Sequence, residues 1–186
     1  MRRTGQNLFR KGQQIADYEH YDDRLVPSLR VVPISDRKYP KLLGSDFVAP
    51  NVACIGDVTL GEGSSLWHAT IVRGDQAKVT IGKNVVVQDL VHIGNSDAKE
   101  NDEIYIGDNS FIGANATLDG CTLEPFAYVG MGAKVGKDAV VESYAIVASG
   151  AVIPAGTVVK SGQVWAGHPA KYLRDVTQEE KHLINE

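Results

Sequence analysis

Histidines and cysteines are among the side chains that can bind a transition metal, and their spacing decides which of them can act together. The sequence contains two cysteines and five histidines: His20, His68, His92, His168 and His182. His68 has no partner at a metal-like spacing, and no spacing recommends His20 or His182 as a ligand. His168 stands directly before Pro169 and is interpreted as structural. None of these four histidines is therefore expected to bind a metal.

The elements that must position these side chains show a six-residue period. From Leu123 onward every sixth residue is aliphatic: Leu123, Val129, Val135, Val141, Val147, Ile153 and Val159. An α-helix repeats every 3.6 residues and a strand alternates every two, so neither explains this period. A hexapeptide solenoid does, because each six-residue unit forms one side of a prism and points its aliphatic side chain inward.

Three further runs extend the period upstream, separated by shifts in register. Their positions are Val48, Cys54, Leu60, Leu66 and Val72, then Ile81, Val87 and Ile93, then Ile106, Ile112 and Leu118. The four runs contain about eighteen units, or about six coils at three sides per coil. The polar segment 94–103 must project as a loop. An ordinary sandwich would need period-two alternation and hairpin turns, so the predicted fold class is an all-β solenoid.

The length of 186 residues is compatible with one domain. The net charge of −4 gives no reason to expect nucleic-acid binding. No stretch approaches the ~20 apolar residues of a membrane span. Cys54 occupies an inward repeat position and is interpreted as a small core residue. A disulfide with Cys121 is not expected, which suits a reducing compartment.

The two ends of the chain lack the repeat. Residues 1–45 are predicted to form an N-terminal arm and an extended strap before a solenoid over residues 46–168. The first sixteen residues carry arginines and no acid, as in a mitochondrial transit segment; a solvated basic arm is the alternative. Thr177 and Glu180 form a capping-box pattern, so residues 169–186 are predicted to end the chain with a helix.

Four segments, in this order, resemble the gamma-class carbonic anhydrases. They are FVAPNVACIGDVTLGEGSSLWHATIVRGD at 47–75, VQDLVH at 87–92, GCTLEPFAYVGMGA at 120–133 and VWAGHPAKYLRDVTQEE at 164–180. Within that family the chain most resembles the gamma-carbonic-anhydrase-like subunits of mitochondrial respiratory complex I. The resemblance implies a left-handed parallel β-helix, assembled as a trimer.

The resemblance also implies where a metal would bind. Family enzymes hold zinc at the subunit interface with three histidines, and His92 matches the first. The other two form a His-x4-His pair whose positions are Ala114 and Asp119 in this chain. Alanine offers no lone pair, and His92 with one aspartate is incomplete, because catalytic zinc needs three protein ligands and one open position for water.

The chain is therefore expected to have no catalytic residue and to bind no metal by itself, with zinc expected only at an interface between other subunits. Arg73, Asp75 and Gln88 match family residues near the metal and at the trimer contact. Because the ligands are missing, these three residues are expected to maintain the trimer interface.

These features predict a non-catalytic structural subunit of a gamma-carbonic-anhydrase-like trimer. The expected partners are paralogues in a heterotrimer and membrane-arm subunits of complex I, on the matrix side of the mitochondrial inner membrane, with the N-terminal arm able to contact the membrane. One alternative is an active metal-dependent carbonic anhydrase that uses His92, Asp119 and ligands from neighbours. A hexapeptide acyltransferase is the other, since it shares the solenoid and the Gly-x-Pro-Ala-Lys ending.

Overall fold

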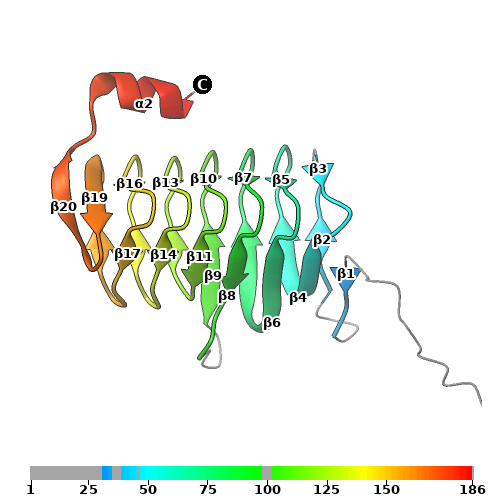
Figure 1. The fold of residues 1–186 in the computed structure, drawn as a ribbon. Helices are drawn as coiled ribbons and strands as arrows, with labels where there is room; N and C mark the ends of the chain where they lie inside the picture. Colours follow the sequence, from blue (N-terminus) through cyan, green and yellow to red (C-terminus); the bar gives the residue numbers. More distant parts are fainter. Residues whose placement is uncertain (1–30, 35–38, 46, 98–101, 186) are drawn as a thin grey trace, which may run out of the picture.

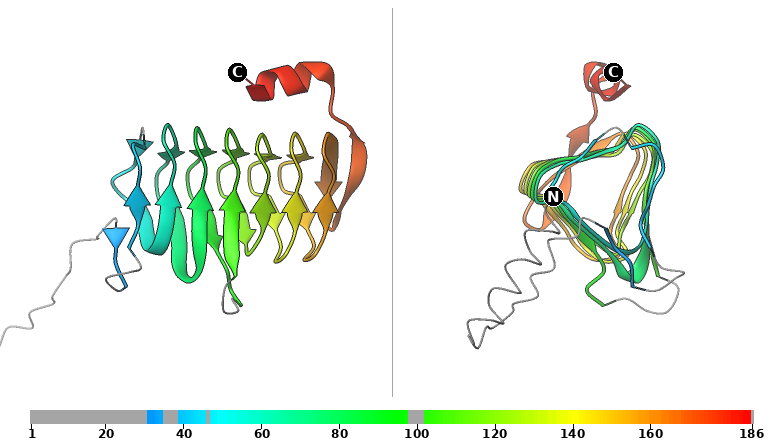
Figure 2. Two further views of the ribbon diagram at one scale, coloured as in Figure 1. Left: turned by 180° about the vertical axis from the view of Figure 1, so that it is seen from behind. Right: turned by 90° about the vertical axis from the view of Figure 1, so that its right-hand side faces the viewer.

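The computed structural model is a three-sided prism of stacked coils (Figure 1). It describes residues 31–34, 39–45, 47–97 and 102–185. Viewed along the axis, the coils superpose as a triangle (Figure 2). The chain is a left-handed parallel β-helix with a C-terminal helix, which confirms the predicted fold class.

One side of the prism, side 3, is a single eight-stranded sheet. Its strands are β3 (Phe47–Val48), β5 (Ser65–Leu66), β7 (Val86–Val87), β10 (Phe111–Ile112), β13 (Tyr128–Val129), β16 (Ile146–Val147), β19 (Gln163–Gly167) and β20 (Ala170–Asp175). All neighbours from β3 to β19 pair in parallel, and β20 pairs antiparallel with β19.

The other two sides belong to one twelve-stranded sheet, because β4 (Ala53–Leu60) and β6 (Ile71–Ile81) continue around the corner between them. Side 1 contains the first parts of β4 and β6, with β1 (Val31–Val32), β8 (His92–Gly94), β11 (Thr117–Asp119), β14 (Lys134–Val135) and β17 (Val152–Ile153). Side 2 contains the second parts of β4 and β6, with β2 (Lys41–Leu42), β9 (Glu103–Ile106), β12 (Thr122–Leu123), β15 (Val140–Val141) and β18 (Val158–Val159).

The predicted register shift after Val72 lies where β6 bends around this corner. Gly74 pairs with Gly56 of β4, and the register of the two strands shifts between Gly56 and Val58. A Cβ at Gly74 would lie 2.4 Å from the backbone oxygen of Asp57, so the two coils approach too closely for a larger residue.

The prism has seven coils rather than the six predicted, since side 3 contains seven parallel strands from β3 to β19. The predicted strap contributes the difference at one end: β1 and β2 pair with β4 and supply two sides of the first coil. At the other end, β19 completes the last coil. The basic segment predicted as an arm, and His20, lie outside the described residues.

The predicted inward residues form the core. Val141 is fully buried between Leu123 and Val159, its partners in the coils on either side. Cys54 is also fully buried, whereas Val48, in the first coil, is half-buried. A second buried layer repeats with the same period of six and was not predicted. Its members are mostly small residues at the corners, among them Ala116, Ala127, Ala133, Ala139, Ala145 and Ala151.

The C-terminal segment differs in part from the prediction. The capping box is present: the Glu180 amide donates to Thr177 Oγ1 at 3.2 Å, and the Thr177 amide donates to Glu180 Oε2 at 2.9 Å. It begins α2 (Gln178–Asn185). Residues 170–175 were expected to be part of the helical end, but they form β20 because their backbone pairs with the last strand of the prism. Across the described residues, no helix combines the length and apolar character needed to cross a lipid bilayer.

Candidate functional site

His92 and Asp119 lie on neighbouring coils of side 1. In the register of β8 and β11, His92 pairs with Thr117, and Gly94 pairs with Asp119. Both side chains border a small notch of about 180 Å³, which we call the side-1 notch. Its lining residues are Arg73, His92, Gly94, Asn95, Ser96, Thr117 and Asp119. The fold thus brings together the two family ligand positions that keep a potential donor.

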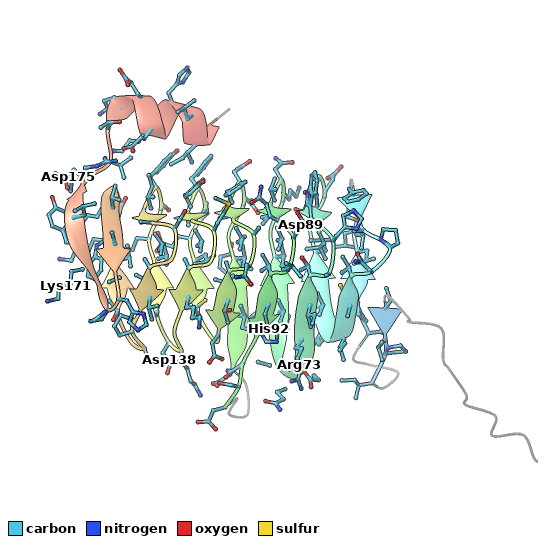
Figure 3. The ribbon with its side chains drawn as sticks, viewed as in Figure 1. Arg73, Asp89, His92, Asp138, Lys171 and Asp175 are labelled. Carbon is cyan, nitrogen blue, oxygen red and sulfur yellow. The ribbon has the colours of Figure 1, made fainter. Side chains whose placement is uncertain are left out.

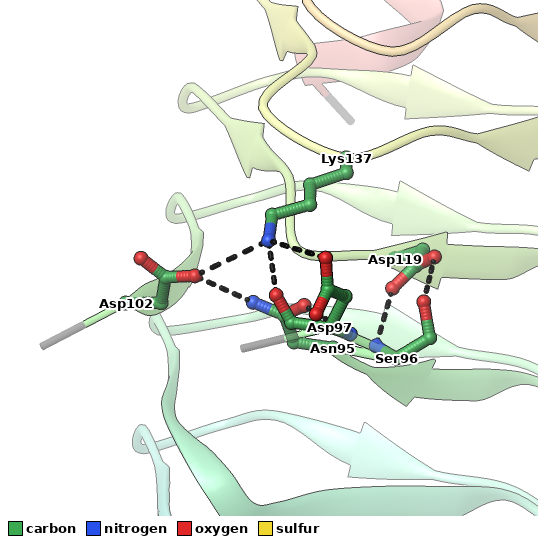
Figure 4. Close-up of polar contacts among 6 residues, drawn as sticks. All are labelled: Asn95, Ser96, Asp97, Asp102, Asp119 and Lys137. Atoms are coloured by element: carbon green, nitrogen blue, oxygen red, sulfur yellow. Dashed lines mark hydrogen bonds and ion pairs between the residues drawn. The ribbon is translucent and has the colours of Figure 1, made fainter. Parts of the chain in front are cut away.

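Asp119 is engaged by a residue of the next segment after β8. Its Oδ1 accepts a hydrogen bond from the Ser96 amide at 2.8 Å, and its Oδ2 accepts one from the Ser96 hydroxyl at 2.7 Å (Figure 4). Hydrogen bonds to an ionised acceptor are stronger than those between neutral groups. The carboxylate therefore holds the chain as it leaves β8.

Lys137 fastens the same segment from a later coil (Figure 4). Its ammonium donates to the backbone oxygen of Asp97 and lies 3.6 Å from Asp102 Oδ2 and 4.0 Å from Asp97 Oδ2. Asn95 Nδ2 donates to the same Asp102 oxygen at 3.1 Å. The Lys137 side chain is only 20% exposed, so these contacts are partly shielded from water. Both ends of the polar loop are tied to the solenoid in this way.

Arg73 forms the wall of the notch nearest the first coils (Figure 3). Its guanidinium donates to both oxygens of Asp75, from Nε at 3.2 Å and from Nη2 at 2.5 Å. Hydrogen bonding from Arg73 lowers the pKa of the Asp75 carboxyl, which stays ionised at neutral pH. Two of the three residues expected at the trimer contact, Arg73 and Asp75, thus form an ion pair within the chain.

Ala114 lies at a different place, on the corner between sides 3 and 1. Its amide donates to Gln88 Oε1 at 3.0 Å, so the Gln88 side chain fixes the backbone of this corner. One coil earlier, Asp89 Oδ1 accepts a hydrogen bond from the His68 amide at 2.9 Å. Figure 3 shows Asp89 well apart from His92 and Arg73. Ala114 does not line the side-1 notch of its own chain.

The residues of the notch do not fit a complete zinc site. In its lining, His92 and Asp119 are the residues whose side chains are common zinc ligands. No cluster of three or more His, Cys, Asp or Glu side chains that could hold a metal occurs among the described residues. Asp119 is in addition held by Ser96. The thiols offer no substitute: both are free and buried, and burial raises the pKa of Cys54 to about 11 and that of Cys121 to about 12.

Ser96, Asn95, Asp102 and Lys137 were not recognised as site residues from the sequence. The first three belong to a segment that reads as an ordinary polar loop. Lys137 is 40 residues from Asp97, and nothing in the local pattern around it signals the contact. Only the stacking of coils brings the two together.

Comparison with known proteins gives a consistent group of relatives, although no protein-family model matches the chain. Gamma carbonic anhydrase 3, mitochondrial, of Arabidopsis thaliana is 48% identical over 184 residues, which are 97% of this chain and 71% of that protein. Gamma carbonic anhydrase-like 1, mitochondrial, of the same plant is 45% identical over 154 residues, or 81% of this chain and 61% of that protein. Among solved structures, a hexapeptide transferase family protein from Anaplasma phagocytophilum has 36% identity and a TM-score of 0.77, covering 83% of this chain and 89% of that one.

Proposed function

This chain belongs to the gamma carbonic anhydrase family, and we propose that it acts there as a non-catalytic subunit of a trimer. One observation carries the proposal: of the three ligand positions implied by the family resemblance, only His92 keeps a histidine. Ala114 has no donor atom, and Asp119 is occupied with Ser96. A homotrimer interface would therefore present two donors where catalytic zinc needs three and a water.

The groups expected to hold subunits together are in place although the ligand set is broken. Gln88 orients the corner at Ala114, and Arg73 is oriented by Asp75 beside the notch. Loss of ligands with preservation of these contacts supports a role in assembly. Within a heterotrimer, only the interface between two other, competent subunits would keep a full ligand set, so at most one metal per trimer is expected.

We place this trimer in mitochondria, on the matrix side of the inner membrane and attached to the membrane arm of complex I. Support comes from the Arabidopsis relatives, whose names include a mitochondrial location, and from the acid-free, arginine-bearing start of the chain. Paralogues of this family are the proposed partners in the trimer, and the N-terminal arm is proposed to contact the membrane.

The test is metal analysis of the trimer as purified from its source, together with identification of the subunits that co-purify. We expect complex I subunits and paralogues to co-purify, and no metal to be bonded to this chain in density maps of each interface. The isolated chain should contain no stoichiometric zinc and should not accelerate CO2 hydration. A fully occupied metal on His92 would favour the active carbonic anhydrase instead.

A hexapeptide acyltransferase is the second candidate, and the similarity to the Anaplasma protein is the observation that favours it. Such an enzyme needs a histidine beside a groove for acyl-coenzyme A. The notch beside His92 has a volume of about 180 Å³, below the 300–1,000 Å³ typical of ligand sites. Titration with acetyl-coenzyme A in a calorimeter separates the two functions, and we expect no binding heat.

A further inference from the structure

An open pocket of about 580 Å³ lies between side 3 of the prism and α2. Its walls come from the three successive coils that contain β7, β10 and β13, and from Leu183 and Ile184 of α2, which runs back alongside the coils (Figure 1). Leu183 is 68% exposed, so α2 leaves the pocket open to solvent. The volume is within the range of about 300–1,000 Å³ that is typical of small-molecule sites. None of the lining side chains is acidic or basic, and the pocket therefore suits an uncharged occupant.

A stack of aromatic rings on side 3 ends inside this pocket. Phe111 of β10 pairs with Tyr128 of β13, and their rings stack with centroids 4.8 Å apart and an interplanar angle of 9°. Tyr128 covers one face of the Phe111 ring, so the other face is directed toward the preceding coil. The residue of that coil in register with Phe111 is Val86, which has no ring. The stack therefore stops at one face of Phe111, and both Phe111 and Val86 line the pocket.

A second aromatic stack follows the corner between sides 2 and 3. The rings of Phe126 and Tyr144 lie 4.9 Å apart at an angle of 3°. Their φ values of 64° and 57° are in the left-handed region, which is strained for bulky side chains and common at functional sites. In the two preceding coils this corner position is held by Asn84 and Asn109, and Asn84 Nδ2 donates to Asn109 Oδ1 at 3.2 Å. Phe126 thus extends the aromatic wall of the pocket, and the two amides add polar groups to it.

We propose that this pocket binds one uncharged small molecule that carries a planar aromatic ring. The ring stacks on the open face of Phe111, above Val86, and continues the stack of side 3 by one coil. The spacing of the coils already places rings at stacking distance, so the prism needs no rearrangement to accept the ligand. The Asn109 amide, which has both donor and acceptor atoms, binds a polar group on the edge of the ring. The pocket shares no residue with the side-1 notch, and the proposal does not depend on the trimer.

The experiment uses the uncharged aromatic dye N-phenylnaphthylamine, whose fluorescence rises in apolar surroundings. The full-length wild type should bind the dye saturably, at about one molecule per chain. Val86→Phe places a ring of the protein where the ligand ring would lie, and it should weaken binding about tenfold. Phe111→Leu keeps an apolar side chain but removes the stacking face, and it should weaken binding about fivefold. The matched control is Ile146→Phe, which should bind as the wild type does, because Ile146 extends the same stack beyond Tyr128 and does not line the pocket.

Competition then tests the chemical class of the ligand. Naphthol should displace the dye at a lower concentration than heptanol, an aliphatic alcohol of similar hydrophobicity, because heptanol cannot stack. Displacement by heptanol at an equal or lower concentration would overturn the assignment of an aromatic ligand.

The variants decide whether the pocket is the site. Melting curves identify any variant that does not fold, and Phe111→Leu carries the test if Val86→Phe is one of them. The proposal is overturned if the wild type does not bind the dye, if a folded Val86→Phe or Phe111→Leu binds it as tightly as the wild type does, or if Ile146→Phe weakens binding as much as Val86→Phe.

Discussion

Asp119 and Ser96, 23 residues apart in sequence, form two hydrogen bonds in which each oxygen of the carboxylate accepts one donor of the serine. The position that the family resemblance assigns to a metal ligand thus fastens the loop between β8 and β9. The substitution of histidine by aspartate is more than the loss of a ligand, since the carboxylate has local partners that an imidazole could not satisfy in the same way.

The two hydrogen bonds between Ser96 and Asp119 predict that substitutions of these residues have coupled effects on stability. Ser96→Ala removes the hydroxyl bond and should lower the free energy of unfolding by about 1 kcal/mol, whereas Asp119→Ala removes both bonds and should lower it by about 2 kcal/mol. In a double-mutant cycle, Ser96→Ala should cost almost nothing once Asp119 is alanine. Urea unfolding of the four proteins measures this. Strictly additive effects would mean that the hydrogen bond between the Ser96 hydroxyl and the Asp119 carboxylate contributes nothing to stability.

The buried column of the prism predicts a large effect of charge at Val141. Val141→Asp places a carboxylate without a partner among aliphatic side chains and should cost about 4 kcal/mol or more, lowering the Tm by about 10 °C. Val158→Asp is the control, because Val158 belongs to the next coil but is 45% exposed. It should change stability by no more than about 0.5 kcal/mol. Equal Tm values for Val141→Asp and the wild type would show that the six-residue register is wrong.

The start of α2 should loosen in acid. Arg174 donates to both oxygens of Glu180, at 2.8 and 2.6 Å, and with the Thr177 amide lowers the pKa of the Glu180 carboxyl from 4.5 to about 2. Because the folded-state pKa is lowered, the stabilisation is complete above about pH 4.5 and is lost as the pH falls toward 2. The protection factor of the Lys181 amide against hydrogen exchange should therefore fall over this range, because this amide is hydrogen-bonded to the Thr177 oxygen.

Two variants check this assignment. In Glu180→Gln the Lys181 amide should have a low protection factor at every pH and lose the acid-dependent step, whereas Glu179→Gln, on the same turn, should behave as the wild type. The ion pair is largely exposed, so added salt should weaken the step. An unchanged profile in Glu180→Gln would assign the transition to another group.

Restoring the missing ligands should restore metal binding. In a homotrimer of Ala114→His/Asp119→His, all three ligand positions that the family resemblance implies would carry a histidine. Elemental analysis should then find about one zinc per chain, against none for Asp119→His alone. CO2 hydration need not return, because the groups that orient the new ligands are absent. A double variant without zinc would contradict the assignment of these two positions.

The sequence by itself determined the parts of this protein that repeat or act locally. Core residues that stack in successive coils, such as Leu123, Val141 and Val159, recur at a constant spacing in the sequence. The spacing is constant because each side of the prism uses the same length of backbone and buries the same kind of side chain. The capping box joins Thr177 and Glu180, which are only three positions apart, so the local sequence predicts it. The absence of histidine at Ala114 and Asp119, the two positions where the family resemblance implies ligands, is likewise visible without coordinates.

Tertiary structure decided the contacts between coils. Each coil stacks a residue on partners about twenty positions away, and the loop after β8 extends this to the 40 residues between Asp97 and Lys137. No local pattern marks such pairs, because an isolated serine or lysine in a polar segment reads as solvated. For the same reason β20 was missed: Ala170–Asp175 is a strand only because the open edge of β19 supplies hydrogen-bond partners.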